Sequence, residues 1–282
     1  MVLSRSRVVA LATATALVAG CDGGGGGETP GADGAGPYLV ATTTIWADIA
    51  GTVACDGTFA VRTLVPPGGD AHGYEPSLRD REMLDGAALV VANGAGLEEL
   101  LEDTLQAVED GGVPVLRLAE ATSGTGGDPH LWFDPTQVRA VLPLLGDAVV
   151  DADADRTAIA ACVAAADAEL GALDEEIEAI LAPIPDRRRI LVTNHDSLGP
   201  FAERYGFEIL GTVLPSSSTL TEASPGELEA LAEQITELDV PAIFTETLHA
   251  STDAEALGER LGIAVVELHT DSLGEPGSGV ET

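Results

Sequence analysis

The stretch Asp128-Pro129-His130-Leu131-Trp132-Phe133-Asp134-Pro135 lies near the middle of the 282-residue chain and separates two similar runs of predicted secondary structure. Short apolar segments alternate with helical patterns before it, and the same alternation returns later in the chain. Such alternation is typical of a parallel sheet with helices on both faces. The expected strands are 38–44, 59–65, 88–92, 113–118, 190–193, 207–214, 242–245 and 264–268. The pattern therefore predicts an α/β protein with two lobes, each with a four-stranded parallel sheet flanked by helices.

Two helices are predicted between the lobes. Asp134 and Pro135 have the residue types of a helix N-cap and first helical residue. A second, longer helix begins near Asp155 and ends before two prolines, which gives it a length of roughly 40 Å. Its apolar residues recur at steps of three and four and form one stripe: Ile159, Val163, Ala166, Leu170, Leu173, Ile177 and Ile180. We expect this long, rigid backbone helix to join the lobes, with an N-terminal lobe at 38–134, connecting helices at 135–185 and a C-terminal lobe at 186–282.

Four side chains that bind metals are expected at the ends of predicted strands. His72, His130, His195 and Asp271 each lie in the loop that follows a strand, two in each half. Ligand sites in open parallel sheets form outside the carboxyl ends of the strands, so two facing sheets would bring these loops into one cleft. Three imidazoles and one carboxylate complete a tetrahedral zinc site. A single loop histidine is more often a surface residue, so the prediction depends on all four meeting.

The remaining candidates have weaker roles. Glu246, at a strand end, is a candidate carboxylate that hydrogen-bonds a ligating imidazole. His249 is expected to be solvated, and His269 is expected only to line the site. Trp132 and Phe133 are interpreted as packing residues rather than chemical ones.

The N-terminus has the pattern of an export signal. Residues 1–20 combine an arginine-bearing start with a short apolar run, which suits a signal peptide and is too short to span a bilayer. Val18-Ala19-Gly20-Cys21 resembles a bacterial lipoprotein box, with an ordinary signal peptide as the alternative. Residues 21–37 are then a lipidated cysteine and a Gly-rich tether, and the protein is expected outside the cytoplasm, anchored to the membrane through Cys21.

Two further cysteines leave two possibilities open. An exported protein meets an oxidising compartment, so Cys55 and Cys162 can form a disulfide. Two buried thiols are an equal alternative, because sequence does not give their separation in space.

The composition excludes some partners. The chain has 47 acidic residues against 13 basic ones, and its formal net charge of −34 opposes binding to nucleic acid or to an anionic membrane surface. For most of these carboxylates, solubility is the expected role. The protein is expected to be a monomer.

Four ordered motifs resemble those of one known family. Gly69–Ser77, Asp128–Pro135, Asn194–Phe201 and Thr270–Gly274 are similar to the metal motifs of the solute-binding proteins of zinc and manganese ABC transporters, specifically the zinc-importer-like lipoproteins of cluster A-I. Asn93-Gly94-Ala95-Gly96-Leu97-Glu98 looks like the turn of that family written NGxGxE. The resemblance covers about residues 38–282. It implies two lobes joined by a long helix, one metal ion in the cleft, no enzymatic activity and delivery of the ion to a membrane permease.

The resemblance also bears on the choice of metal. The family has histidine at the third ligand position in many zinc binders and glutamate in many manganese binders, and here the residue is His195. Imidazole favours zinc over manganese, so Zn²⁺ is predicted, with Mn²⁺ as the alternative. Two departures are expected: the loop before His130 has no His-rich insert, and the C-terminal lobe lacks the family's usual final helix. Outside this class, a zinc-dependent hydrolase with Glu246 as its base and a surface adhesin with an idle site stay open.

Overall fold

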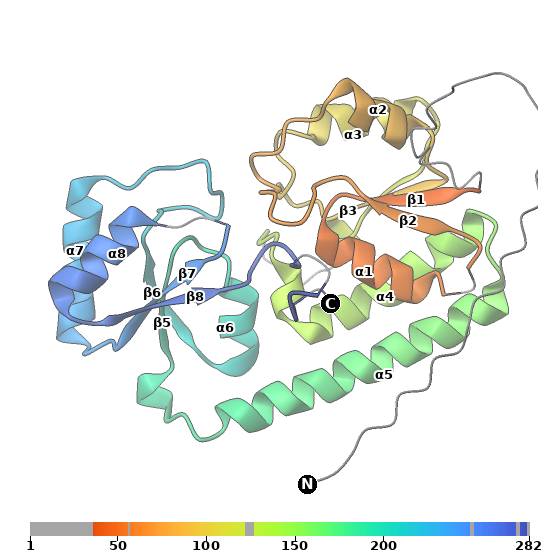
Figure 1. Ribbon diagram of the computed structural model, residues 1–282. Helices are drawn as coiled ribbons and strands as arrows, with labels where there is room; N and C mark the ends of the chain where they lie inside the picture. Colours follow the sequence, from red (N-terminus) through yellow and green to blue (C-terminus); the bar gives the residue numbers. More distant parts are fainter. Residues whose placement is uncertain (1–35, 56, 122–126, 249–250, 275–276, 281–282) are drawn as a thin grey trace, which may run out of the picture. The chain divides into compact units, whose positions relative to one another are not determined.

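The computed structural model describes residues 36–55, 57–121, 127–248, 251–274 and 277–280. The first lobe contains a sheet of four parallel strands in the order β2-β1-β3-β4. Its strands are β1 Tyr38–Ala41, β2 Ala60–Thr63, β3 Leu89–Ala92 and β4 Val115–Arg117. Its helices are α1 Thr44–Val53, α2 Leu78–Asp85 and α3 Glu102–Asp110. The predicted fold class is confirmed for this lobe (Figure 1).

The second lobe repeats this arrangement, with parallel strands in the order β6-β5-β7-β8. Its strands are β5 Ile190–Thr193, β6 Glu208–Thr212, β7 Ala242–Glu246 and β8 Ala264–Leu268. Its helices are α6 Gly199–Tyr205, α7 Pro225–Glu237 and α8 Thr252–Leu261. The edge strand β8 is less covered than the others, since Val266 is 38% exposed.

Alternation along the strands builds the core of the first lobe. Leu39 and Ala41 of β1 pack toward α1, α4 (Pro135–Asp151) and α5 (Arg156–Leu181), whereas Val40 packs toward α2 and α3 on the opposite face. All four residues of β3 are buried, as a strand covered on both faces requires. In the second lobe one apolar cluster joins β5 and β7 to α7 and α8.

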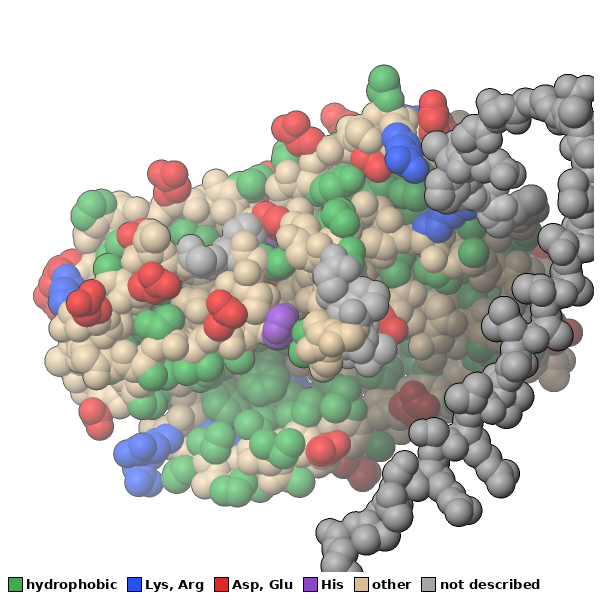
Figure 2. Space-filling model, in the orientation of Figure 1, with side chains coloured by type: hydrophobic (Ala, Val, Ile, Leu, Met, Phe, Trp, Pro, Cys, Tyr) green, Lys and Arg blue, Asp and Glu red, His purple; other side chains and the backbone are tan. Residues whose placement is uncertain are grey.

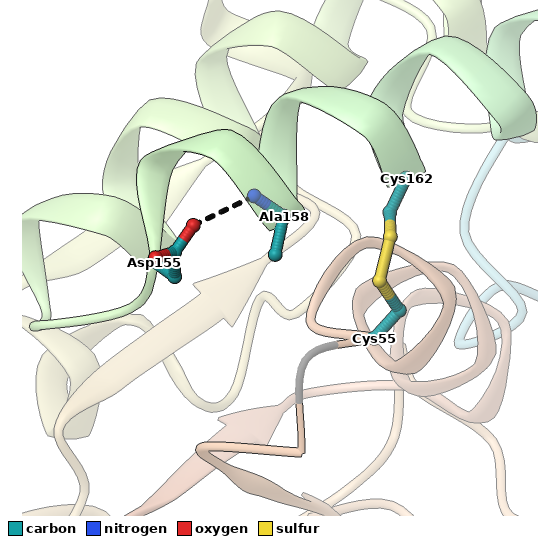
Figure 3. Close-up of a disulfide and its surroundings, with 4 residues drawn as sticks. All are labelled: Cys55, Asp155, Ala158 and Cys162. Carbon is teal, nitrogen blue, oxygen red and sulfur yellow. Dashed lines mark hydrogen bonds between the residues drawn. A yellow bond between two sulfur atoms is a disulfide. The ribbon is translucent and has the colours of Figure 1, made fainter.

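Helix α5 is the long helix predicted from the sequence (Figure 1). Asp155 caps it by accepting a hydrogen bond of 2.8 Å from the Ala158 backbone N–H, and Asp134 caps α4 in the same way through Thr136. Near its start, Cys162 forms a disulfide with Cys55, which lies just after the end of α1 (Figure 3). The disulfide alternative is therefore the one found.

The second half of α5 is held by polar contacts rather than by the predicted apolar stripe. Arg204 of α6 forms ion pairs with Asp174 and Glu178, and the Tyr205 hydroxyl donates to Asp174 at 2.9 Å. Ile159 and Ala166 of the predicted apolar stripe are buried, but Leu173 is 45% and Ile180 is 64% exposed. The stripe is therefore covered only along the first half of the helix. The side chain that the helix buries there is Asp174.

The residues that directly follow β3 form a turn, and α3 begins only after it. Gly94, Ala95 and Gly96 all have positive φ angles, and regular helix starts only at Glu102. The cause is Glu98, whose carboxylate turns back to accept hydrogen bonds from the Asn93 and Gly94 backbone N–H groups. The residues after β3 therefore form a tight turn before α3.

Candidate metal site

The first lobe contributes two buried histidines. His72 lies in the loop after β2, and its backbone N–H donates to the Asp70 carboxylate at 2.9 Å. His130 lies in the loop between β4 and α4, where Asp128 Oδ1 accepts from both its backbone N–H at 2.9 Å and its Nδ1 at 2.8 Å. Each histidine is thus oriented by the aspartate two residues before it.

The second lobe contributes His195 and Asp271. His195 follows β5 and its Nδ1 lies 2.5 Å from Glu246 Oε1, at the end of β7. Asp271 follows β8 and is 3% exposed. Because all these strands are parallel, their carboxyl ends place these residues at one edge of the sheet. Glu246 therefore has the place expected of a carboxylate that orients a ligating imidazole.

The structure brings all four predicted side chains together. The Nε2 atoms of His72 and His195 each lie 3.3 Å from Nε2 of His130, and Asp271 Oδ2 lies 3.8 Å from Nε2 of His195. A tetrahedral zinc ion with Zn–N bonds of about 2.0 Å holds its nitrogens about 3.3 Å apart. The separations between these imidazole nitrogens therefore fit ligands that share one ion.

The hydrogen bond at Nδ1 of each imidazole determines whether Nε2 has a lone pair for a metal ion. An imidazole Nδ1 that faces a carboxylate carries the proton, which leaves a lone pair on Nε2. This holds for His130 facing Asp128 and for His195 facing Glu246. Two lone pairs that face each other at 3.3 Å require a shared proton or cation between them.

The buried carboxylates also require a cation nearby. Among the described residues, neither oxygen of Asp271 has a hydrogen-bond partner, and the same is true of Glu246 Oε2. Buried charge without partners is costly unless a cation compensates it. Burial raises the pKa of the Asp271 carboxyl. Burial lowers the pKa of His195, but the hydrogen bond that its Nδ1 donates to Glu246 and the charge of Asp271 outweigh burial, so that this pKa is raised.

Contacts between the lobes hold the loop that carries Asp271. The Trp132 indole N–H donates to the Thr270 carbonyl at 2.9 Å. On the other side of Asp271, Ser272 Oγ accepts from the Gly68 N–H at 3.0 Å, and the Leu273 N–H donates to Thr44 Oγ1 at 2.8 Å. Trp132 thus does more than the packing predicted for it.

A further contact between the lobes was also missed by sequence reasoning. Thr219, in the Ser/Thr-rich loop after β6, donates its hydroxyl to Asp70 Oδ2 at 2.7 Å. Asp70 therefore connects this loop to the backbone of His72. The polar composition of the loop was the available signal, but it does not identify the partner.

Of the two remaining histidines, the structure describes only His269, and this residue does not join the cluster. His269 is exposed and lies near Thr247, while His249 is outside the described residues. His269 does line a largely apolar cavity of about 500 Å³ beside α5, together with Trp132 and Leu173. None of the four predicted ligands lines that cavity, and Figure 2 shows hydrophobic side chains gathered in a hollow on this face.

Fold and site together define a two-lobed protein with a buried cluster of histidine and carboxylate side chains that could hold a metal ion. The family model described as ZnuA, zinc-uptake complex component A, periplasmic, matches residues 39–282, and the chain belongs to this family. It is accordingly a metal-binding substrate-binding protein of ABC metal import and not an enzyme. This finding removes the hydrolase alternative.

Two relatives and one solved structure are similar to the chain. It is 30% identical over 276 residues to the manganese-binding lipoprotein MntA of Halalkalibacterium halodurans, covering 94% of this chain and 89% of the relative. It is 31% identical over 299 residues to the zinc-binding protein TroA of Treponema pallidum, covering 99% and 94%. The solved structure of the periplasmic zinc binding protein TroA from Treponema pallidum matches with a TM-score of 0.80 and 28% identity, covering 88% of this chain and 93% of that one.

The described part of the chain contains no helix that is both long and apolar enough to cross a membrane. The predicted signal peptide and Cys21 lie outside the described residues.

Proposed function

We propose that this protein captures one Zn²⁺ ion between its lobes and delivers it to a membrane permease, with His72, His130, His195 and Asp271 as the four ligands. The observation that carries the proposal is the 3.3 Å spacing of the imidazole nitrogens, which equals the edge of a tetrahedral zinc site. The unpartnered Asp271 oxygens support the fourth position.

Charge favours an ion that is held rather than used in catalysis. Three neutral imidazoles and one carboxylate leave a formal charge of about +1 on a bound Zn²⁺ site. Glu246 and Asp128, which contact the far sides of two imidazoles, compensate this charge without occupying ligand positions. Four protein ligands complete a closed tetrahedral shell, whereas a catalytic zinc keeps one position for water.

Manganese is the second candidate. His195, Glu246 and Asp271 have ligand atoms that lie within 4.8 Å of one another, so carboxylate oxygens are available beside the imidazoles. Manganese prefers such oxygen ligands and larger coordination numbers. A relative at 30% identity is named for manganese. The three imidazoles nevertheless favour zinc.

Calorimetric titration of metal-free protein with Zn²⁺ and with Mn²⁺ tests both assignments. We expect one tight zinc site, weaker manganese binding and loss of zinc binding in His195→Ala. His269→Ala is the matched control, because it removes an exposed histidine outside the cluster. Tighter binding of manganese than of zinc would reverse the assignment. Unchanged zinc affinity in His195→Ala would contradict the ligand set.

The contacts between the lobes suggest how the ion leaves. All four proposed ligands are at most 3% exposed, so release requires movement. The Asp271 loop is bound to the first lobe on both sides of the ligand, through Thr270 and Ser272. A permease that separates the lobes slightly would pull this loop and withdraw one ligand, which lowers the affinity for the ion.

Anchoring and the remaining alternative belong to the same proposal. We place the protein outside the cytoplasm with Cys21 as its lipidated residue, and mass spectrometry of the mature N-terminus tests this. The adhesin alternative predicts that zinc leaves the melting temperature unchanged, whereas a bound ion stabilises the folded state by mass action.

A further inference from the structure

The turn after β3 has backbone geometry that its length alone does not require. Three successive residues, Gly94, Ala95 and Gly96, have φ angles of +81°, +52° and +84°. A positive φ is uncommon for a residue with a side chain and costs free energy at Ala95. The turn is held in this form by Glu98, which is 3% exposed.

Glu98 acts as an internal anion for the turn. Its carboxylate accepts from the Asn93 N–H at 2.7 Å, the Gly94 N–H at 3.0 Å and the Thr42 hydroxyl at 2.5 Å. Successive backbone N–H groups that converge in this way form an anion-binding nest. Here the chain fills the nest with its own side chain, which fixes the direction of the residue at its start, Asn93.

Every polar side-chain atom of Asn93 is engaged, and one of its bonds reaches the metal loop. Asn93 Oδ1 accepts from the buried Trp46 indole at 2.8 Å, and Nδ2 donates to the Gly94 carbonyl at 2.9 Å. Nδ2 also donates to the Pro129 carbonyl at 2.8 Å. Pro129 is the residue immediately before His130.

The peptide group between Pro129 and His130 is therefore held from both sides. Asn93 binds its carbonyl oxygen, and Asp128 Oδ1 binds its N–H at 2.9 Å. The plane of this peptide determines where the His130 side chain leaves the backbone. Because His130 is the imidazole whose Nε2 lies 3.3 Å from both other histidines, an error in its direction disturbs the whole cluster.

We infer that Asn93, held by Glu98, is a positioning residue for the metal ligand His130 and acts through the Pro129–His130 peptide. The inference rests on the proposed function, in which His130 binds the ion. It assigns a role to the Asn93–Glu98 turn, which contains no metal ligand.

Asn93→Asp is the sharpest test, because it keeps the shape and the acceptor for Trp46 but replaces the donor facing Pro129 with a second oxygen. We expect zinc affinity to fall about tenfold or more, as for other groups that orient metal ligands. We also expect the visible absorption of the Co²⁺-loaded protein to change, since it reports ligand geometry. Glu98→Gln, which weakens the nest, should move both readouts in the same direction and carries the test if Asn93→Asp does not fold.

Val108→Ala is the matched control, since Val108 is fully buried in α3 of the same lobe but belongs to the apolar cluster around Val40, whereas Leu131, next to His130, belongs to the other cluster. A native Co²⁺ spectrum and native zinc affinity in Asn93→Asp would overturn the inference. So would equal changes in Val108→Ala at a similar loss of melting temperature, because the role would then be general stability. His130→Ala distinguishes failure of the proposed ligand set from failure of the positioning role. If His130→Ala retains zinc binding, the proposed ligand set is wrong. If His130→Ala loses zinc binding but Asn93→Asp does not, only the positioning role is refuted.

Discussion

Replacing Glu246 with glutamine removes one charge from the second lobe and keeps the size of the side chain. Glu246 Oε1 accepts the Nδ1 proton of His195, and both residues are almost fully buried. A glutamine that turns its amide nitrogen toward Nδ1 would move the imidazole proton to Nε2, the atom that faces the ion. A glutamine that presents its oxygen preserves the tautomer but binds the proton more weakly.

The expected cost follows from this contact. Groups that orient a ligating histidine typically change metal affinity by 10- to 100-fold, which corresponds to about 1.4–2.8 kcal/mol. We expect the upper half of this range, because the hydrogen bond is short, charge-assisted and shielded from water. Isothermal titration with Zn²⁺, using a competing chelator, measures the change.

Glu267→Gln is the control for this experiment, since it removes the same charge from an exposed position on β8. It should leave affinity within about twofold, because exposed charges are screened. Equal losses in the two variants would mean that long-range charge, and not orientation of His195, determines the effect. No loss in Glu246→Gln would refute the reasoning outright.

The pH dependence of zinc affinity provides a second test of the role of Glu246. Protons compete with the ion for His195, so zinc affinity should fall as pH drops through the raised pKa of this residue. Without the Glu246 charge that pKa is lower, so the fall begins at a lower pH in Glu246→Gln. The affinities of the two proteins should therefore converge in acid. In the metal-free protein, protonated His195 stabilises the fold below its unfolded pKa, and this stability is lost as pH rises through the raised pKa.

Three other predictions follow from features outside the ligands. Replacing Cys55 and Cys162 with serine opens a loop with a sequence separation of 107, and the chain-entropy model gives a loss of about 4.8 kcal/mol in the free energy of unfolding. Calorimetry should therefore show a melting temperature lower by about 10–20 °C, with zinc affinity unchanged. An unaltered melting temperature would contradict this prediction. In Gly199→Ala the new Cβ would collide with Asp128 Oδ2, which should weaken zinc binding about tenfold through His130. Gly226→Ala is the control, because a Cβ there meets nothing within 4 Å, and this variant should bind zinc normally. Equal affinities in the two variants would refute the role of Asp128. With a net charge of −34, the protein should melt at a higher temperature as NaCl rises from 0.05 to about 1 M, because salt screens self-repulsion; a flat or falling trend would show that repulsion does not limit stability. Figure 2 shows more acidic than basic side chains on the face in view.

The ligand positions could be predicted because topology alone constrains them. Parallel strands end at a common edge, so His72 and His130, which follow strands of the same sheet, are expected near one another once the strands are recognised. Caps such as Asp134 and Asp155 are equally local, since a helix start depends on a few adjacent residues. These parts of the fold required no knowledge of distant contacts.

Contacts between residues far apart in the sequence could not be predicted in this way. The pairing of Cys55 with Cys162 depends on a distance that sequence does not contain, and so does the bond from Thr219 to Asp70. Burial along α5 could not be predicted either, because Leu173 continues the apolar stripe but is exposed. An apolar period shows which residues share a face, but a partner surface decides whether that face is covered, and here the second lobe pairs with Asp174 instead.

The two attachment points of α5 restrict changes in the length of the helix. Cys162 ties it to the first lobe and Asp174 ties it to the second, with the two attachment points about 18 Å apart along the axis. One residue inserted between them would advance the far attachment by about 1.5 Å and turn it by about 100°. His195 and Asp271 would then swing away from His72 and His130. Insertions here should therefore be tolerated only in lengths close to whole helical turns, such as seven residues, and then only if the shift along the axis can be absorbed elsewhere.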